Sequence, residues 1–189
     1  MRQFKLLGAA LAAALLVAAC GGSDDAVVQA PPIQYTSLVS FGDSLSDVGT
    51  HKVGTVAALG GGTYSVNGIS GVIPSKNWTE LMAAQIGVAA PCPAQTGLTG
   101  DPSQGFSIPV VNHPGCTNYA QGGARVTDPV GMGSAAAPVN SPLGQLTVPI
   151  VTQISNHLGR VGSFSGTELV TVFAGANDVF RLLETLVAN

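Results

Sequence analysis

The apolar positions of the chain follow two different periods, which predicts alternating strands and helices. Residues 37–41 (SLVSF) and 168–175 (ELVTVFAG) are short apolar runs closed by glycine, a pattern typical of buried strands. Apolar residues recur at helical spacing over 78–86, 150–161 and 179–186. Because the strands are apolar without alternation and helices follow them, the pattern predicts an α/β fold with a parallel sheet covered on both faces.

The expected helices carry signals at their ends. Asn77, followed three residues later by Glu80, resembles a capping box, and Gly87 is suited to end that helix. Pro149 fits the first turn of the second helix, and Asp178 is suited to cap the third. The faces expected to pack on the sheet, with Trp78 as a core anchor, are Trp78, Leu81, Met82 and Ile86; Ile150, Val151, Ile154, Leu158 and Val161; and Val179, Leu182, Leu183 and Leu186.

The N-terminus has the pattern of an export signal. Arg2 and Lys5 precede an uncharged apolar stretch over 6–19, which at 14 residues is short for a membrane span of about 20 residues. A buried helix and ordinary cleavage at the small residues are the alternatives. The stretch ends in VAAC, which resembles a bacterial lipobox with Cys20 as the lipidated residue. We therefore expect a lipoprotein signal peptide over 1–19, a flexible tether over 20–34 and one domain over 35–189.

Composition excludes several function classes and leaves others. The chain is 46% hydrophobic and 9% charged, with a net charge of −3, 25 glycines and 12 prolines, so a sizeable core with long loops and no nucleic-acid partner is expected. Most of 88–142 is turn-forming sequence. Within it, Cys92 and Cys116 could form a disulfide outside the cytoplasm or stay as two free buried thiols. A metal site is not indicated, because histidines and cysteines do not cluster, and no organic cofactor is implied either.

Ser44 lies directly after the first expected strand, in FGDSLSDVG (41–49), and Asn177 follows the second expected strand in the same way. Carboxyl ends of parallel strands meet at one edge of a sheet, so we expect both residues at that edge. A serine in this place is a candidate nucleophile, although a polar turn residue or helix cap has the same appearance. Asp43 and Asp47 are expected to hold the turn through local hydrogen bonds.

Three short motifs occur in order: FGDSLSDVG, NYAQGGA (118–124) and GAND (175–178). Together they resemble the first, second and third blocks of the SGNH/GDSL family of esterases and lipases, over residues 38 to about 189. The resemblance implies a three-layer α/β/α fold with a mostly parallel, flavodoxin-like sheet, incomplete at the C-terminus. It also implies hydrolysis of a small-molecule or lipid ester by a chain that is lipid-anchored in the bacterial cell envelope, with the outer membrane favoured over the inner.

The resemblance assigns a role to each matched position. Ser44 corresponds to the nucleophile, Gly123 to a backbone N–H donor, with Gly122 as the alternative register, and Asn177 to a side-chain amide donor. Attack on an ester creates a tetrahedral oxyanion, which needs fixed donors aimed at one point. The N–H groups of Ser44 and Gly123 and the Asn177 amide would supply three such donors.

The family's general base belongs to an Asp-x-x-His block, and this sequence has none. Its three histidines, His51, His113 and His157, follow valine, valine and isoleucine at the third preceding position. We read His157 as a boundary residue of its helix and His113 as a turn residue, and nothing in the sequence orients His51 toward Ser44. The chain is therefore expected to be a truncated family member that is weakly active or inactive, with an open apolar edge at its second strand. The alternatives are a non-catalytic ligand-binding lipoprotein and a non-functional gene remnant.

Overall fold

The structure is a computed structural model that describes residues 33–64, 67–69 and 73–187. The chain divides into two units, Met1–Ile33 and Gln34–Asn189, and every element described below lies in the second. The expected signal peptide, Cys20 and nearly all of the tether lie outside the described residues.

The two predicted strands pair in parallel, as expected. β1 (Ser37–Gly42) and β6 (Glu168–Phe173) are in register from Ser37 opposite Glu168 to Gly42 opposite Phe173. Asn118 forms isolated parallel bridges to Ser40 and to Pro93, so extended chain continues the sheet on the far side of β1. The parallel α/β prediction is therefore confirmed.

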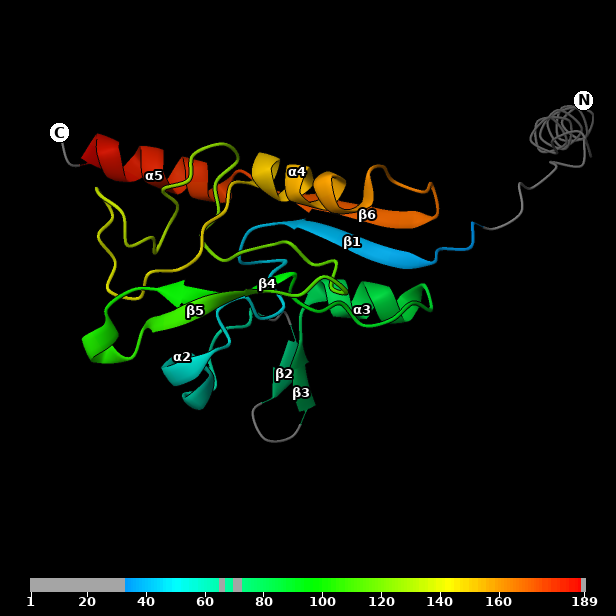
Figure 1. The fold of residues 1–189 in the computed structure, drawn as a ribbon, viewed down its shortest axis with the longest axis horizontal. Helices are drawn as coiled ribbons and strands as arrows, with labels where there is room; N and C mark the ends of the chain where they lie inside the picture. The colour runs from blue at the N-terminus through cyan, green and yellow to red at the C-terminus, as the bar shows by residue number, and fades with distance from the viewer. Residues whose placement is uncertain (1–32, 65–66, 70–72, 188–189) are drawn as a thin grey trace, which may run out of the picture. The chain divides into compact units, whose positions relative to one another are not determined.

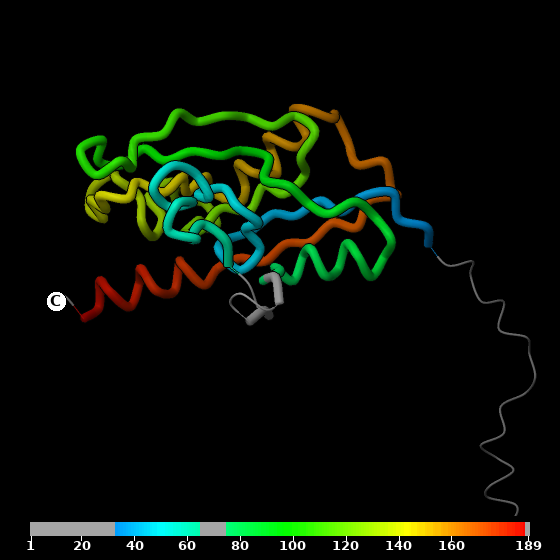
Figure 2. The backbone as a smooth tube through the Cα atoms, turned by 90° about the horizontal axis from the view of Figure 1, so that it is seen from below, coloured from blue at the N-terminus to red at the C-terminus, as the bar shows by residue number. Residues whose placement is uncertain are grey.

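Helices contact β1 from both sides (Figure 1). α4 (Ile150–Val161) lies over one face of the β1–β6 pair and α3 (Trp78–Gln85) lies against the other. α5 (Ala176–Val187) continues beyond the carboxyl end of β6 in both views (Figures 1 and 2), and α2 (Gly54–Ala58) is a short helix near the hairpins. The core cluster next to β1 contains Val39, Phe41, Ala94, Tyr119 and Ile150.

α3 begins as its sequence predicts, but it presents a different face to the core. The Asn77 side chain and Glu80 form a complete capping box. The buried residues of the helix are Thr79 and Ala83, whereas Trp78 is only half-buried and Leu81 is exposed. The expected core role of Trp78 is therefore wrong. The contacting face therefore carries small side chains, and the larger apolar residues of the helix are only half-buried or, in the case of Leu81, exposed.

The apolar face predicted for α5 is exposed. Val179, Leu182, Leu183 and Leu186 are each more than half exposed, and Asn177 is the buried residue of this helix. In α4, Ile150 is buried as expected, but Val151 and Val161 are exposed. Within the described part of the chain β6 pairs only with β1, so its outer edge is open, as the sequence predicts.

The loop-rich stretch 88–142 contains a hairpin that the sequence did not indicate. β4 (Gln95–Thr99) and β5 (Ser107–Asn112) pair antiparallel around a short 3₁₀ turn, η1 (Pro102–Gln104). A second hairpin joins β2 (Asn67–Ile69) and β3 (Ile73–Lys76). The stretch 88–142 is rich in turn-forming glycine and proline, so its composition gave no indication of the two short strands.

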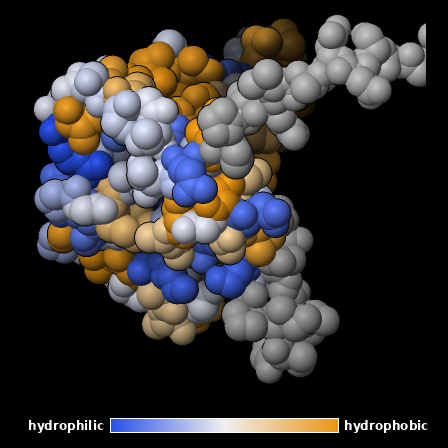
Figure 3. All heavy atoms as spheres, turned by 90° about the vertical axis from the view of Figure 1, so that its right-hand side faces the viewer, coloured by the Kyte–Doolittle hydropathy of each residue, from blue (hydrophilic) through white to orange (hydrophobic). Residues whose placement is uncertain are grey.

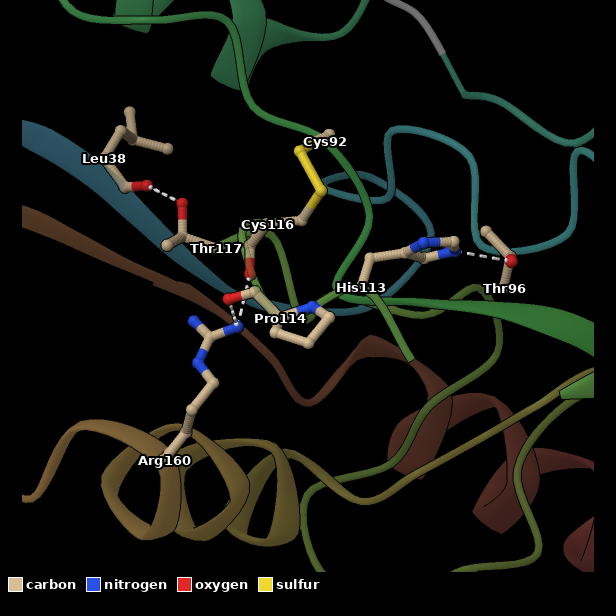
Figure 4. The surroundings of a disulfide bond; sticks show 8 residues. All are labelled: Leu38, Cys92, Thr96, His113, Pro114, Cys116, Thr117 and Arg160. Atoms are coloured by element: carbon tan, nitrogen blue, oxygen red, sulfur yellow. Dashed lines mark hydrogen bonds between the residues drawn. A yellow bond between two sulfur atoms is a disulfide. The ribbon is translucent and has the colours of Figure 1, made fainter. Parts of the chain in front are cut away.

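Cys92 and Cys116 are bonded to each other, with 5.0 Å between their Cα atoms (Figure 4). The bridge closes the segment that holds the β4–β5 hairpin. Beside it, Arg160 of α4 donates to the carbonyl oxygens of Pro114 and Cys116, and the Thr117 hydroxyl donates to the Leu38 carbonyl of β1. The disulfide, α4 and β1 therefore fix the start of the segment that leads to Gly123.

Candidate active site

The candidate site begins where β1 and β6 end. Gly42 and Phe173 form the last register pair, and Ser44 and Asn177 follow them by two and four residues. The backbones are so close here that a Cβ atom on Gly42 would lie 2.6 Å from the Phe173 carbonyl oxygen. Only glycine fits this position, and its close approach brings the loops after the two strands together.

Two buried aspartates shape the loop that carries Ser44. Asp43 accepts a hydrogen bond from the Leu45 N–H (3.0 Å), and Asp47 accepts from the N–H groups of Gly49 (2.9 Å) and Thr50 (2.8 Å). Both carboxylates therefore hold the turn locally, as expected from the sequence. Burial raises the pKa of Asp43 above its ordinary value, although the hydrogen bond from the Leu45 N–H opposes this shift. Its second oxygen has no hydrogen-bond partner among the described residues.

Ser44 itself is half-buried. Within the described residues its hydroxyl makes no hydrogen bond, and its backbone N–H also lacks an acceptor. Its carbonyl accepts from the Asp47 N–H, which closes the turn. The side chain is thus available for a ligand, and no hydrogen bond joins it to a histidine within the described residues.

Four buried hydrogen bonds fasten this loop to the segment 118–122. The Gln121 N–H donates to the Gly42 carbonyl (3.1 Å), and the Gly122 N–H donates to Asp47 Oδ2 (2.8 Å). The Asn118 side chain donates to the Ser46 carbonyl (2.8 Å), and the Thr50 hydroxyl donates to the Ala120 carbonyl (3.1 Å). The first and second motifs therefore form one buried unit, although about 75 residues separate them along the chain.

The two glycines of the second motif are in different environments. The Gly122 N–H is occupied by Asp47, whereas the Gly123 N–H has no acceptor among the described residues. Gly123 has a φ of +81°, and a Cβ atom there would lie 1.9 Å from the Met132 carbonyl oxygen. A side chain is therefore excluded at Gly123 by both conformation and space. Of the two candidates for the backbone donor, Gly122 and Gly123, only Gly123 has an N–H without an acceptor within the described residues.

Asn177 connects the third motif to the second. It lies in the first turn of α5, is buried, and donates from Nδ2 to the Ala124 carbonyl (2.9 Å), the residue next to Gly123. Asp178 does not cap the helix as expected. Its carboxylate accepts from the Val126 N–H (3.0 Å) and pairs with Arg125, because the segment after the second motif lies directly against the start of α5.

Each of the three histidines is held by hydrogen bonds or packing that do not involve Ser44. His51 is buried, with Nε2 3.1 Å from the Leu146 carbonyl and Nδ1 3.7 Å from Asp47 Oδ2. Because a carbonyl only accepts, Nε2 carries the proton. Burial lowers the pKa of His51, although the Asp47 charge opposes this shift. Both ring nitrogens thus face other groups, and no described contact links His51 with Ser44.

His157 is not the boundary residue that its position in the sequence suggested. It is buried, stacks on Phe164 and lies edge-on to Phe41 and Tyr119, with Nδ1 3.2 Å from the Tyr119 hydroxyl. His113 is bonded to the Thr96 hydroxyl at 2.8 Å (Figure 4). The aromatic cluster on the α4 side of β1 explains why His157 is buried, since its imidazole packs there like a small aromatic ring.

Gln153 of α4 supports the site and was not anticipated. Its side chain is 1% exposed and bonds both backbone groups of Gly42, accepting from the N–H and donating to the carbonyl, each at 2.9 Å. It also donates to the Val148 carbonyl (2.9 Å). One clue was present in the sequence: a glutamine in line with the apolar positions of the helix, one residue from Ile154.

The described residues contain no group of three or more histidines, cysteines or acidic residues placed to hold a metal ion. They also contain no helix of the length and apolarity required to cross a bilayer.

The model of the GDSL-like lipase/acylhydrolase family matches residues 38–189. The chain belongs to this family. No curated protein matches it closely enough to add to this assignment. The match spans β1 through α5 and includes all three motifs, so the α/β architecture described above is that of an SGNH/GDSL hydrolase.

Membership in the GDSL-like family assigns the chain to the hydrolases of ester bonds at the level of the family. The roles of individual residues are a separate matter. The structure brings together the segments that carry Ser44, Gly123 and Asn177, through the Gly42–Gln121, Asp47–Gly122 and Asn177–Ala124 hydrogen bonds.

Proposed function

We propose that this chain carries the nucleophile and oxyanion hole of a serine ester hydrolase. Ser44 attacks the carbonyl carbon of the ester, and the N–H groups of Ser44 and Gly123 together with the Asn177 amide stabilise the oxyanion. The observation that carries the proposal is the unused donors: the N–H groups of Ser44 and Gly123 have no acceptor within the described residues. Asn177 Nδ2 uses one hydrogen on Ala124 and retains a second.

Proton transfer is the missing part of this mechanism. A serine hydroxyl needs a base to become a good nucleophile, and the 189 residues contain no Asp-x-x-His. The imidazoles of His51 and His157 are buried in other contacts. We therefore propose that a polypeptide of these residues hydrolyses esters slowly, with about 10³- to 10⁴-fold acceleration over water from binding and the oxyanion hole.

Chemical rescue tests this proposal directly. Hydrolysis of 4-nitrophenyl butyrate is measured with and without added imidazole, which supplies a base from solution. We expect an imidazole-dependent increase above the buffer background in the wild type and in Ser103→Ala, and none in Ser44→Ala. Ser103 is a matched control because it is exposed and, within the described residues, its N–H and hydroxyl bond Asp101. Equal rates in all three proteins would refute Ser44 as nucleophile, and fast imidazole-independent turnover lost in Ser44→Ala would refute the absence of a base.

The oxyanion hole has its own test. Asn177→Ala removes one proposed donor and should lower the Ser44-dependent rate by about 10²- to 10³-fold. The variant also loses the bond to the Ala124 carbonyl, so its melting temperature is measured in parallel. A folded variant with an unchanged Ser44-dependent rate would remove Asn177 from the proposal.

A second function that a polypeptide of these 189 residues could have is ligand binding without turnover. In that case an ester or acid would bind at the same site and be recovered intact, with the same affinity in the wild type and in Ser44→Ala. A gene remnant, the third alternative, would give no folded protein.

We further propose that the chain is anchored in the bacterial envelope, in the outer membrane rather than the inner, through acyl chains on Cys20. The support is the sequence VAAC at 17–20, after a basic start and an apolar stretch. Mass spectrometry of the exported protein should find a lipid-modified Cys20 as the first residue. Unmodified cleavage after Ala19 or nearby would refute the lipid anchor.

A further inference from the structure

A cavity of about 480 Å³ lies apart from the candidate active site. The end of the β4–β5 hairpin forms one wall of this cavity, α4 forms the other, and residues of the second motif lie between them. Ser44, Gly123 and Asn177 are not among the residues that line it. Cavities of this size hold small organic ligands, so this one has room for a molecule much larger than a simple ion.

The amide side chains of this cavity are hydrogen-bonded in a row. Gln95 donates from Nε2 to Asn112 Oδ1 (2.9 Å), and Gln121 donates from Nε2 to Gln95 Oε1 (3.0 Å). Gln121 Oε1 accepts from the Val148 N–H (2.9 Å), so all three amide oxygens are engaged. Both amide hydrogens of Asn112, and one each of Gln95 and Gln121, have no acceptor within the described residues. The cavity therefore offers donors to a ligand that is rich in oxygen acceptors.

Arg160 of α4 adds a positive charge at the cavity. Its Nη1 group donates to the carbonyl oxygens of Pro114 and Cys116 (Figure 4), and its guanidinium lies 5.3 Å from the centre of the Tyr119 ring. Arg160 forms no ion pair within the described residues, and none of the residues that line the cavity is acidic. A guanidinium that is held in place with Nε and Nη2 unused suits a carboxylate, which it can bind through two parallel hydrogen bonds.

Apolar groups lie among these donors. Ala94, Pro114 and Val148 line the cavity beside the amides, and hydrophilic and hydrophobic residues are interspersed in the same way on the face seen in Figure 3. A saccharide has a matching surface, because its hydroxyl and ring oxygens surround faces of C–H groups. A fatty acid would leave the amide donors unpaired, and a peptide would bring N–H groups for which the engaged amide oxygens provide few acceptors.

We propose that this cavity binds a saccharide that carries a carboxylate. The carboxylate lies at Arg160, and the hydroxyl oxygens accept hydrogen bonds from the amides of Asn112 and Gln121. Because Ser44 is not part of this site, binding of the saccharide and hydrolysis of an ester can each fail while the other is present.

Two monosaccharides that differ at one carbon atom test the proposal on the full chain. D-Glucuronate and D-glucose carry the same ring hydroxyl groups, but only glucuronate has a carboxylate. Their dissociation constants are measured by saturation-transfer NMR at low salt, where the charge of Arg160 is screened least. Glucuronate should bind about 10- to 100-fold more tightly than glucose, as expected for a hydrogen-bonded charge. Equal affinities, or no binding of glucuronate, would overturn the proposal. Acetate bound as tightly as glucuronate would also overturn it and indicate an adventitious ion only.

Substitutions separate the charge from the amides. Arg160→Gln should reduce the affinity for glucuronate to that for glucose, whereas Asn112→Ala should weaken both sugars by similar factors. Arg181→Gln is the matched control for loss of a cation, because Arg181 lies in α5 and does not line the cavity. This control and Ser44→Ala should both keep the full preference for glucuronate. An equal loss of preference in Arg160→Gln and Arg181→Gln would overturn the proposal, because net charge alone would then explain the binding.

A measurement on the wild type covers the case in which Arg160→Gln does not fold, since that variant also loses the bonds to Pro114 and Cys116. In proton–nitrogen correlation spectra, the side-chain N–H signals of Arg160 and Asn112 should shift as glucuronate is added, and that of Arg181 should not. Shifts confined to Asn177 would place the sugar at the candidate active site and overturn the proposal. Triglycine bound in preference to glucuronate would overturn it as well, because the ligand would then be a peptide.

Discussion

Gln153→Met should clearly destabilise this protein. Methionine has nearly the shape of glutamine, so the change removes hydrogen bonds and leaves little cavity. The Gln153 side chain is 1% exposed, and it bonds the Gly42 N–H, the Gly42 carbonyl and the Val148 carbonyl. The Gly42 carbonyl also accepts from the Gln121 N–H, so it keeps one partner.

The loss of stability follows from the groups that the substitution leaves unpaired. The buried Gly42 N–H loses its acceptor, and a buried unsatisfied group costs about 1–3 kcal/mol, whereas the bond to the Val148 carbonyl is only part-buried and water can replace it. The expected decrease in the free energy of unfolding is therefore about 1–3 kcal/mol. For a domain of this size, that corresponds to a decrease in melting temperature of about 2–12 °C.

Urea and thermal unfolding, followed by circular dichroism, measure this loss in the wild type, Gln153→Met and Gln85→Met. Gln85 is an exposed helical glutamine in α3, so its substitution controls for the change in side-chain chemistry. We expect Gln85→Met to change the free energy of unfolding by less than about 0.5 kcal/mol. A decrease in Gln153→Met no larger than that of the control would refute the reasoning, because it would mean that other groups satisfy Gly42 and Val148.

Three further predictions concern covalent and ionisable groups. Replacing both Cys92 and Cys116 by alanine should lower the free energy of unfolding by about 3 kcal/mol, given their separation of 24 residues, and a melting temperature equal to that of the oxidised wild type would contradict this. The Glu168 carboxylate accepts from the N–H groups of Ser165 and Gly166, which lowers its pKa to about 2. Its contribution to stability is thus present above its ordinary pKa of 4.5 and is lost as the pH falls toward about 2; a carboxyl carbon that titrates near 4.5 by NMR, or an unchanged acid limb in Glu168→Gln, would refute this. Burial, together with the charge of Arg160, lowers the pKa of His157 below 6.5, so the unfolded chain binds its proton more readily and stability is lost as the pH falls below about 6.5. His157→Gln should lose less stability than the wild type between neutral pH and about pH 5, and equal losses would show that His157 does not contribute.

The elements with strong local signals were predictable from the sequence, and those that depend on distant contacts were not. The capping box at Asn77 and the strand at β6 depend on local sequence, and both are present; the predicted burial of β6 is wrong, because none of its residues is buried and Val170, Val172 and Phe173 are exposed. The face that a helix buries is decided by what packs against it. In α3 the sheet contacts the side with Ala83, so that Trp78, the largest side chain of the helix, is only half-buried.

For the candidate site, the sequence placed Ser44 and Asn177 at one edge of a parallel sheet, and the β1–β6 pairing agrees with that placement. It could not indicate the hydrogen bonds that hold the edge together. The contacts of Gln153 with Gly42 and of Asp47 with Gly122 join residues 111 and 75 positions apart. No local pattern encodes such pairs, because their geometry arises only after β1, α4 and the second motif have packed.

Most polar residues of the three motifs support the backbone of the site. Asp43 and Asp47 hold the loop around Ser44, Asn118 bonds that loop from the second motif, and Asp178 bonds the segment after it. Donors that stabilise an oxyanion are effective only when they are fixed before the charge develops, since reorientation during the reaction would cost free energy. The hydrogen bonds of Asp47, Asn118 and Asp178 would fix the donors in this way, whether or not a proton acceptor is present. In the proposed function, the groups that would stabilise the transition state are separate from the base that would activate Ser44, so loss of one of these hydrogen bonds should slow the imidazole-rescued reaction.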